Sequence, residues 1–144
     1  NIDGLHQKAG SKEVYEFHGT TRKLICLDCG QEFEFKKSYL KEELPPRCSF
    51  CDGILKPDFV FFGEGIPERE YTLSLEETSK ADLFLIIGTT GAVVPASLLP
   101  KKAKAQGSSI IEVNTRESNY TDTITDIFLQ GQATTVMEKL NSII

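Results

Sequence analysis

The sequence lacks any long hydrophobic run and any surplus of positive charge. Its longest aliphatic stretch, Leu83 to Ile87, is far shorter than the roughly 20 apolar residues that cross a bilayer, so we expect no membrane partner. The 16 Lys and Arg are outnumbered by 21 Asp and Glu, which gives a formal net charge of -5. Because nucleic-acid binding needs clustered cations to neutralise phosphates, we expect no direct nucleic-acid partner and favour a cationic ligand or peptide.

Repeats and biased tracts are also missing, and 40% hydrophobic with 26% charged residues is typical of an ordinary globular chain. A chain of 144 residues can bury a core but leaves little room for a second substrate domain. It begins with Asn1 in a loop-like string rather than with Met, so we expect it to be a fragment. Nothing in the sequence suggests secretion, which favours an intracellular, cytoplasmic protein.

The hydrophobic pattern predicts strands that alternate with helices in the second half of the chain. Strands are expected at 83–87, 109–113 and 126–129, and helices at 67–80, 95–106 and 133–140. The first of these strands does not alternate, so we expect burial on both of its faces. This order indicates right-handed βαβ units and a parallel sheet of the α/β class. The loops that follow two of the strands, Gly88–Thr90 and Asn114–Arg116, should then meet at one crevice.

Two further strands are expected closer to the N-terminus. The string at 13–18 alternates and predicts a short strand that ends at His18, and the compact apolar run at 59–62 predicts a buried strand. Between 20 and 57 the composition changes to cysteines and charges, with too few aliphatic residues for a core. We expect that stretch to need a metal ion.

Four cysteines form two C-x2-C pairs separated by 18 residues, which lies within the spacing of two-knuckle zinc ribbons. The predicted zinc ligands are Cys26, Cys29, Cys48 and Cys51. Four thiolates leave no open coordination position, so the ion should be structural and catalysis should lie elsewhere. The alternatives are iron in the same thiolate cage, or two disulfides, which such closely spaced pairs form poorly.

Taken together, the motifs resemble the carboxyl-terminal part of the sirtuin core, the NAD-dependent protein lysine deacylases. In the family's order, the matching strings around the cysteine ribbon are Asn1-Ile2-Asp3-Gly4-Leu5-His6, Glu16-Phe17-His18-Gly19, Lys56 to Glu64, Gly88-Thr89-Thr90, Glu112-Val113-Asn114 and Gly131-Gln132-Ala133. The resemblance implies a partial Rossmann-like sheet at 1–19 and 58–144 with an inserted zinc module at 20–57. The family's Gly-Ala-Gly phosphate loop is absent from the sequence, so we expect half of an NAD site.

The resemblance also assigns roles to individual residues. It implies that His18 is the general base toward a ribose hydroxyl and that Asn1 assists catalysis; an isolated histidine at a strand end is more often structural. The residues implied to bind NAD are Asn1, Ile2, Asp3, Gly88, Thr89, Thr90, Asn114, Arg116 and Ala133. Those implied to bind the acyl-lysine peptide are Val60, Phe61, Phe62, Gly63 and Glu64, although an apolar strand is usually core.

The expected function is therefore deacylation of an acyl-lysine peptide with NAD, giving nicotinamide, deacylated peptide and O-acyl-ADP-ribose. We expect the isolated chain to be inactive, and to self-associate through the surface that the missing half would cover. ADP-ribosyl transfer is the nearby variant. A non-catalytic zinc-ribbon interaction module is the alternative from another class.

Overall fold

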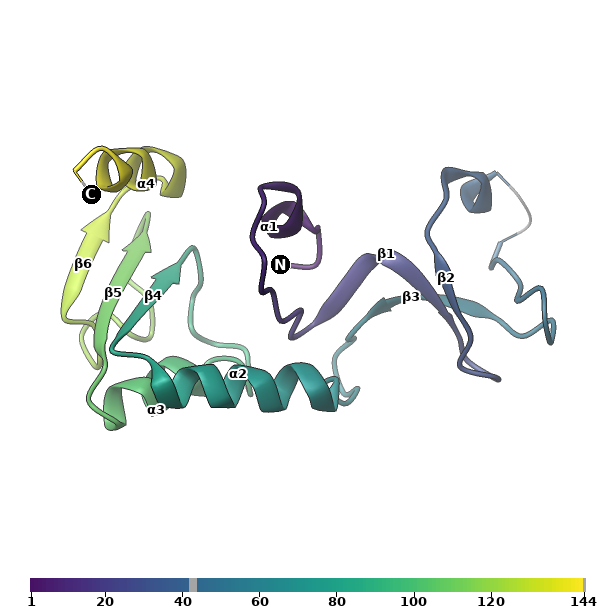
Figure 1. Ribbon diagram of the computed structural model, residues 1–144, viewed down its shortest axis with the longest axis horizontal. Coiled ribbons are helices and arrows are strands. Elements are labelled where there is room, and N and C mark those ends of the chain that lie inside the picture. The colour runs from purple at the N-terminus through teal and green to yellow at the C-terminus, as the bar shows by residue number, and fades with distance from the viewer. Residues whose placement is uncertain (42–43, 144) are drawn as a thin grey trace. The chain divides into compact units, whose positions relative to one another are not determined.

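The computed structural model describes residues 1–41 and 44–143 (Figure 1). These residues divide into two compact units, with the boundary between Tyr71 and Thr72. Residues 42 and 43 of the predicted 20–57 module, and residue 144, lie outside the described part. The predicted boundaries between a module at 20–57 and the rest of the chain stay a prediction. Within the described residues, no helix is both long and apolar enough to span a bilayer.

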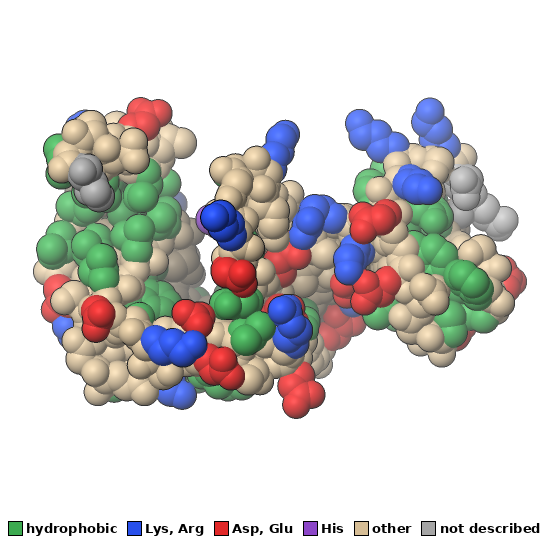
Figure 2. Space-filling model, in the orientation of Figure 1, with side chains coloured by type: hydrophobic (Ala, Val, Ile, Leu, Met, Phe, Trp, Pro, Cys, Tyr) green, Lys and Arg blue, Asp and Glu red, His purple; other side chains and the backbone are tan. Residues whose placement is uncertain are grey.

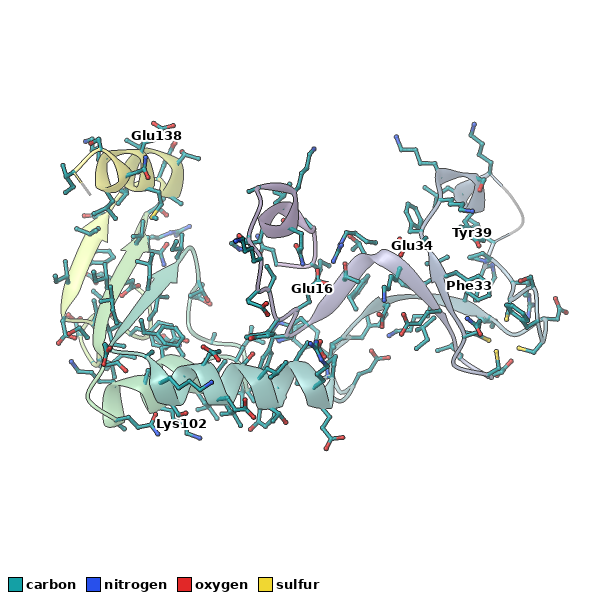
Figure 3. All side chains as sticks on the ribbon, viewed as in Figure 1. Glu16, Phe33, Glu34, Tyr39, Lys102 and Glu138 are labelled. Atoms are coloured by element: carbon teal, nitrogen blue, oxygen red, sulfur yellow. The ribbon has the colours of Figure 1, made fainter. Side chains whose placement is uncertain are left out.

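The first unit is built on a three-stranded antiparallel sheet with the order β2-β1-β3. Its elements are α1 (Leu5–Lys8), β1 (Gly19–Cys26), β2 (Glu32–Glu34), the 3-10 helix η1 (Lys37–Leu40) and β3 (Leu55–Phe59). The buried core consists of Leu24, Cys26, Cys48 and Leu55, with Phe33 and Tyr39 packed against it (Figure 3). Two of the four core residues are thus cysteines, so the apolar core of this unit is small.

The expected strand at 13–18 is wrong, and His18 directly precedes β1 instead of ending a strand. The backbone here is used in local turns, because the Phe17 N–H donates to the Tyr15 carbonyl and the Gly19 N–H donates to that of Glu16. At Gly19 the chain turns through a φ of 72°, and a Cβ there would lie 2.8 Å from Cα of Phe59. A glycine is therefore required where the chain enters β1.

The expected buried strand at 59–62 is also wrong beyond its first residue. β3 ends at Phe59, and Phe62 is 99% exposed. The reason is a local turn, in which the Glu64 N–H donates to the Phe61 carbonyl and the Glu64 carboxylate accepts the Phe61 N–H at 2.9 Å. These backbone groups are not available to a strand partner.

The second unit has the predicted parallel sheet, with the order β4-β5-β6. Its elements are α2 (Glu68–Lys80), which contains the boundary between the units, β4 (Leu83–Ile87), α3 (Leu98–Ala105), β5 (Ser109–Asn114), β6 (Ile127–Gln130) and α4 (Ala133–Asn141). The core comprises Ile86, Ala103, Ile110 and Tyr120, with Phe84 and Ile124 packed on it. Helix α3 begins three residues later than expected, because the chain forms a turn before Leu98.

Burial of β4 on both faces is the wrong prediction in this unit. Leu83, Leu85 and Ile87 are 55%, 39% and 42% exposed, and β4 is an edge strand of the sheet. Figure 2 shows hydrophobic side chains gathered over the strands of this unit. Ile86, which faces the other side, is 4% exposed. A continuous apolar run indicates a strand that suits burial on two faces, but the described residues cover only one of them.

Candidate functional site

The four cysteine sulfurs lie within 4.8 Å of one another at the end of the antiparallel sheet (Figure 3). The Sγ atoms of Cys26 and Cys51 are 3.5 Å apart, and those of Cys29 and Cys48 are 3.7 Å apart. A Zn–S bond is about 2.3 Å, so tetrahedral geometry separates two bound sulfurs by about 3.8 Å. All four thiols are free. The cysteines are therefore positioned to hold a structural zinc ion.

Each cysteine pair is held by a tight turn. The Gly30 N–H donates to the Cys26 carbonyl at 3.0 Å and the Asp52 N–H donates to the Cys48 carbonyl at 2.9 Å. Positive φ falls on Gly30 (72°) and on Asp52 (62°). Gly53 is needed for space rather than for its dihedral angle, since a Cβ there would lie 2.8 Å from the Cys26 sulfur.

The thiols also have electrostatic reasons to bind a cation. Backbone N–H groups, that of Cys29 first, lower the pKa of Cys26 to about 7. The Gly53 N–H acts in the same direction on Cys51, but the neighbouring sulfurs of Cys29 and Cys26, together with burial, raise the pKa of Cys51 to about 12. Clustered thiolates repel one another, and a divalent cation at their centre removes that repulsion.

In the second unit, three loops meet at Asn114, the last residue of β5. Its Nδ2 donates to the Thr89 carbonyl at 2.7 Å, and its own carbonyl accepts the Gly131 N–H at 2.9 Å. The predicted nucleotide loops Gly88–Thr90 and Asn114–Arg116 are thus brought together at the carboxyl ends of parallel strands. The turn at Gly131, which precedes Ala133, lies at the same edge because of its hydrogen bond to Asn114.

The loop after β4 is open around its glycine turn. Gly88 has a φ of 64°, and apart from its own neighbours in the chain no atom of the described residues lies within 4 Å of the position that a Cβ would take there. Thr89 and Thr90 are exposed, as is Arg116 after β5. Open space above a glycine turn, flanked by exposed hydroxyls and a guanidinium, can accommodate a phosphate-bearing ligand.

In the first unit, the N-terminal loop lies beside the beginning of β1. The Ile2 carbonyl accepts the N–H and the hydroxyl of Thr21, at 2.9 and 3.0 Å. Asp3 accepts the Leu5 N–H at 2.9 Å, and Asn1 is exposed. His18 is half-buried, and its ring packs edge-on against Phe17 with 5.3 Å between centroids.

The predicted peptide segment, Val60 to Glu64, is tied to Lys56. The Lys56 ammonium donates to the Glu64 carboxylate and to the Phe59 carbonyl, both at 2.9 Å, and lies 4.9 Å from the Phe61 ring centroid. The hydrogen bond from Lys56, and then the one from the Phe61 N–H, lower the pKa of Glu64. Glu64 is therefore an anionic anchor of this turn.

Sequence reasoning missed an ion pair whose arginine packs against the N-terminal loop. Arg22 pairs with Glu16 at 2.7 Å, and a Cβ on Gly4 would lie 2.7 Å from the Arg22 side chain. No sequence signal joins these residues. It also gave Glu112, which is fully buried in β5, no role beyond its place in a matching string. A carboxylate within an apolar strand was the available signal, because buried charges need specific partners.

Comparisons with known proteins agree with this geometry. The sequence model of the Sir2 family matches residues 1–95. NAD-dependent protein deacylase 2 of Pyrobaculum aerophilum is 41% identical over 140 residues, which are 97% of this chain and 55% of that protein. The NAD-dependent protein deacylase of Aquifex aeolicus is also 41% identical, over 97% of this chain and 58% of its own length.

Solved structures are similar over nearly the whole chain. A Sir2 homolog–NAD complex superposes with a TM-score of 0.92 at 36% identity, covering 99% of this chain and 55% of that one. Sir2Tm bound to a propionylated peptide gives a TM-score of 0.94 at 29% identity, covering 99% and 61%. The chain spans somewhat more than half the length of these relatives. With a matched family model, a parallel sheet and a four-cysteine zinc site, the chain belongs to the Sir2 family, the sirtuins.

Proposed function

We propose that this chain contributes the zinc module, the histidine base and the adenosine side of the nucleotide site to an NAD-dependent protein lysine deacylase. The substrates are NAD, an acyl-lysine peptide and water, and the products are nicotinamide, the deacylated peptide and O-acyl-ADP-ribose. The observation that carries the proposal is the meeting of three loops at Asn114. It is supported by relatives of this sequence that are named NAD-dependent protein deacylases.

The chain's residues divide the work. Asn114, Gly88 to Thr90, Arg116 and Ala133 bind the adenosine part of NAD, while Asn1, Ile2 and Asp3 orient its nicotinamide ribose. When bound, NAD supplies the ribose carbon that receives the acyl oxygen. An imidazole nitrogen of His18 takes up the proton of a ribose hydroxyl.

Val60, Phe61, Phe62 and Gly63 bind the acyl-lysine peptide, with Lys56 and Glu64 holding their turn. Phe61 is 47% and Phe62 99% exposed, so apolar surface is available to an acyl chain. The zinc ion supplies folding energy and takes no part in proton transfer, because four thiolates complete its coordination.

The test is a deacylation assay with acyl-lysine peptide and NAD, monitored by nicotinamide release. We expect no turnover by the chain alone, which carries no Gly-Ala-Gly phosphate loop. A fusion in which this chain replaces the matching part of the Aquifex aeolicus relative should be active, and the same fusion with His18→Ala is its control. A folded, zinc-loaded fusion without activity would contradict the proposal.

The same assay separates the alternatives. A peptide that gains the mass of ADP-ribose would indicate ADP-ribosyl transfer. A fusion that binds a protein partner through the 20–57 module but neither NAD nor acyl peptide would indicate an interaction module.

We also propose the domain organisation of a zinc module at 20–57 inserted into a Rossmann-like domain at 1–19 and 58–144, which limited proteolysis at both junctions would test.

Self-association is proposed from the exposed edge strand β4. Leu83, Leu85 and Ile87 present apolar side chains on one face, and the outer edge of β4 has no strand partner among the described residues. Exposed apolar edges promote pairing between chains. Sedimentation should show association that Leu85→Lys abolishes, and a monomeric wild-type chain would contradict it.

We place the protein in the cytoplasm, because free zinc-binding thiols suit a reducing compartment, and cell fractionation would test this.

A further inference from the structure

Glu112 is the only carboxylate among the fully buried side chains of the described residues. Its Oε2 accepts hydrogen bonds from the hydroxyls of Thr121 and Thr125, both at 2.9 Å. Its Oε1 is buried and has no partner among the described residues. Because an unpaired buried carboxylate is costly, the two threonine hydroxyls anchor their segment to β5 more firmly than exposed hydrogen bonds would.

The anchored segment, residues 115–125, is folded around Tyr120. The Tyr120 carbonyl accepts the N–H groups of Thr123, Ile124 and Thr125 at 3.0 to 3.1 Å. The Tyr120 side chain is 2% exposed, and its hydroxyl donates to the Ser97 carbonyl at 3.2 Å. The segment therefore has its own internal order in addition to its bonds to Glu112.

This segment holds the loop after β4 at successive residues. The Asn119 N–H donates to the Thr90 carbonyl at 3.0 Å, and the Asn119 side chain donates to that of Gly91 at 3.4 Å. The Tyr120 ring packs so closely that a Cβ on Gly91 would lie 2.7 Å from it. The Asn114 side chain likewise donates to the Thr89 carbonyl, at 2.7 Å.

We propose that residues 115–125 form a brace, anchored by Glu112 and Tyr120, that positions the 88–91 loop for the nucleotide. This inference rests on the proposed function and extends it, because it assigns nucleotide affinity to residues beneath the loop. A loop that is ordered before binding loses less conformational entropy when the ligand arrives. Glu112, Thr121 and Thr125 are thus positioning residues and contact no substrate.

The test uses the 144-residue chain and a double substitution, Thr121→Val with Thr125→Val, which removes both hydroxyls at nearly constant volume. The double substitution to Ser keeps both hydroxyls and should behave as wild type. Thr134→Val, at an exposed position of α4, is the matched control. Amide hydrogen exchange is measured at Asn119, in the brace, and at Ser109, whose N–H donates to the Asp82 carbonyl.

The Val double variant loses two hydrogen bonds to a carboxylate, so we expect exchange at Asn119 to become at least about tenfold faster, with Ser109 unchanged. An unchanged rate at Asn119 would overturn the brace. Equal acceleration at Ser109 would overturn it too, because the variant would then only loosen the whole unit.

An NMR titration with ADP-ribose, followed at the Thr89 and Thr90 amides, provides the functional arm. The Val double variant should bind at least about tenfold more weakly than wild type, and the Ser double variant equally well. Wild-type affinity in a Val variant with fast exchange would overturn the assignment of affinity to the brace. If the wild-type chain itself does not bind ADP-ribose, the proposed nucleotide site fails, whereas the exchange data still judge the brace.

Discussion

The zinc site makes the sharpest prediction, and Cys48→Ala is the perturbation. Cys48 is buried, its sulfur lies 3.7 Å from that of Cys29, and it is one of the four residues that form the core of its unit. Removing it leaves three thiolates and an open coordination position. We expect the variant to lose most of its zinc, whereas the wild-type chain should contain about one ion.

The structure sets the size of the effect. The two aliphatic residues of this core, Leu24 and Leu55, contribute about 1.5–3 kcal/mol each by burial. A module of this size with so small an apolar core usually needs a metal ion or disulfides to fold, so we expect the module at 20–57 to depend on the ion. Structural zinc contributes about 10–16 kcal/mol in zinc-finger peptides, enough to decide whether the module folds.

Elemental analysis and amide hydrogen exchange would check this. The Cys26 N–H, which donates to the Gln31 carbonyl at 3.0 Å, should lose protection in Cys48→Ala and after chelation, while Ser109 in the second unit stays protected. Ser49→Ala, at the exposed neighbouring position, is the control. A metal-free chain in which the Cys26 amide keeps its protection would refute the reasoning, and iron in place of zinc would change the metal assignment alone.

Three other changes test the remaining assignments. In the active fusion, His18→Ala should lower kcat by about a hundred- to ten-thousandfold while NAD still binds in calorimetry, and a loss below tenfold would mean that His18 is structural. Lys56→Met frees the turn that Glu64 anchors, so it should raise KM for the peptide more than KM for NAD. Lys56→Arg should stay closer to wild type. Equal changes in both KM values would argue against a peptide site at this turn. The hydrogen bond from Lys104, followed by that from a backbone N–H, lowers the pKa of Asp126. The contribution of Asp126 to stability is therefore complete above the usual carboxyl pKa of about 3.9 and is lost as the pH falls through the lowered value. In Asp126→Asn, the free energy of unfolding by urea should fall less steeply as the pH is lowered through this acid range. The same fall as in the wild type would contradict this.

Several features could be predicted from the sequence because they depend on neighbouring residues. A C-x2-C pair brings two sulfurs together within one turn, so its spacing alone indicates a metal site. The parallel sheet followed in the same way from short apolar runs that alternate with helical segments, and β4, β5 and β6 lie within one or two residues of their expected bounds. The loops after β4 and β5 could be placed at one edge, since parallel strands end on the same side.

Other features depend on partners that are distant in the chain, and only the tertiary structure decided them. Burial of β4 depends on what covers its faces, which the run of apolar letters does not record. Glu64 reads as a solvated charge until Lys56 is found 2.9 Å away. Glu112 becomes an anchor only when Thr121 and Thr125 fold back onto it. Local patterns determine which element forms, whereas pairing of polar groups across the fold determines what each side chain does, because a buried charge is stable only where its partners converge.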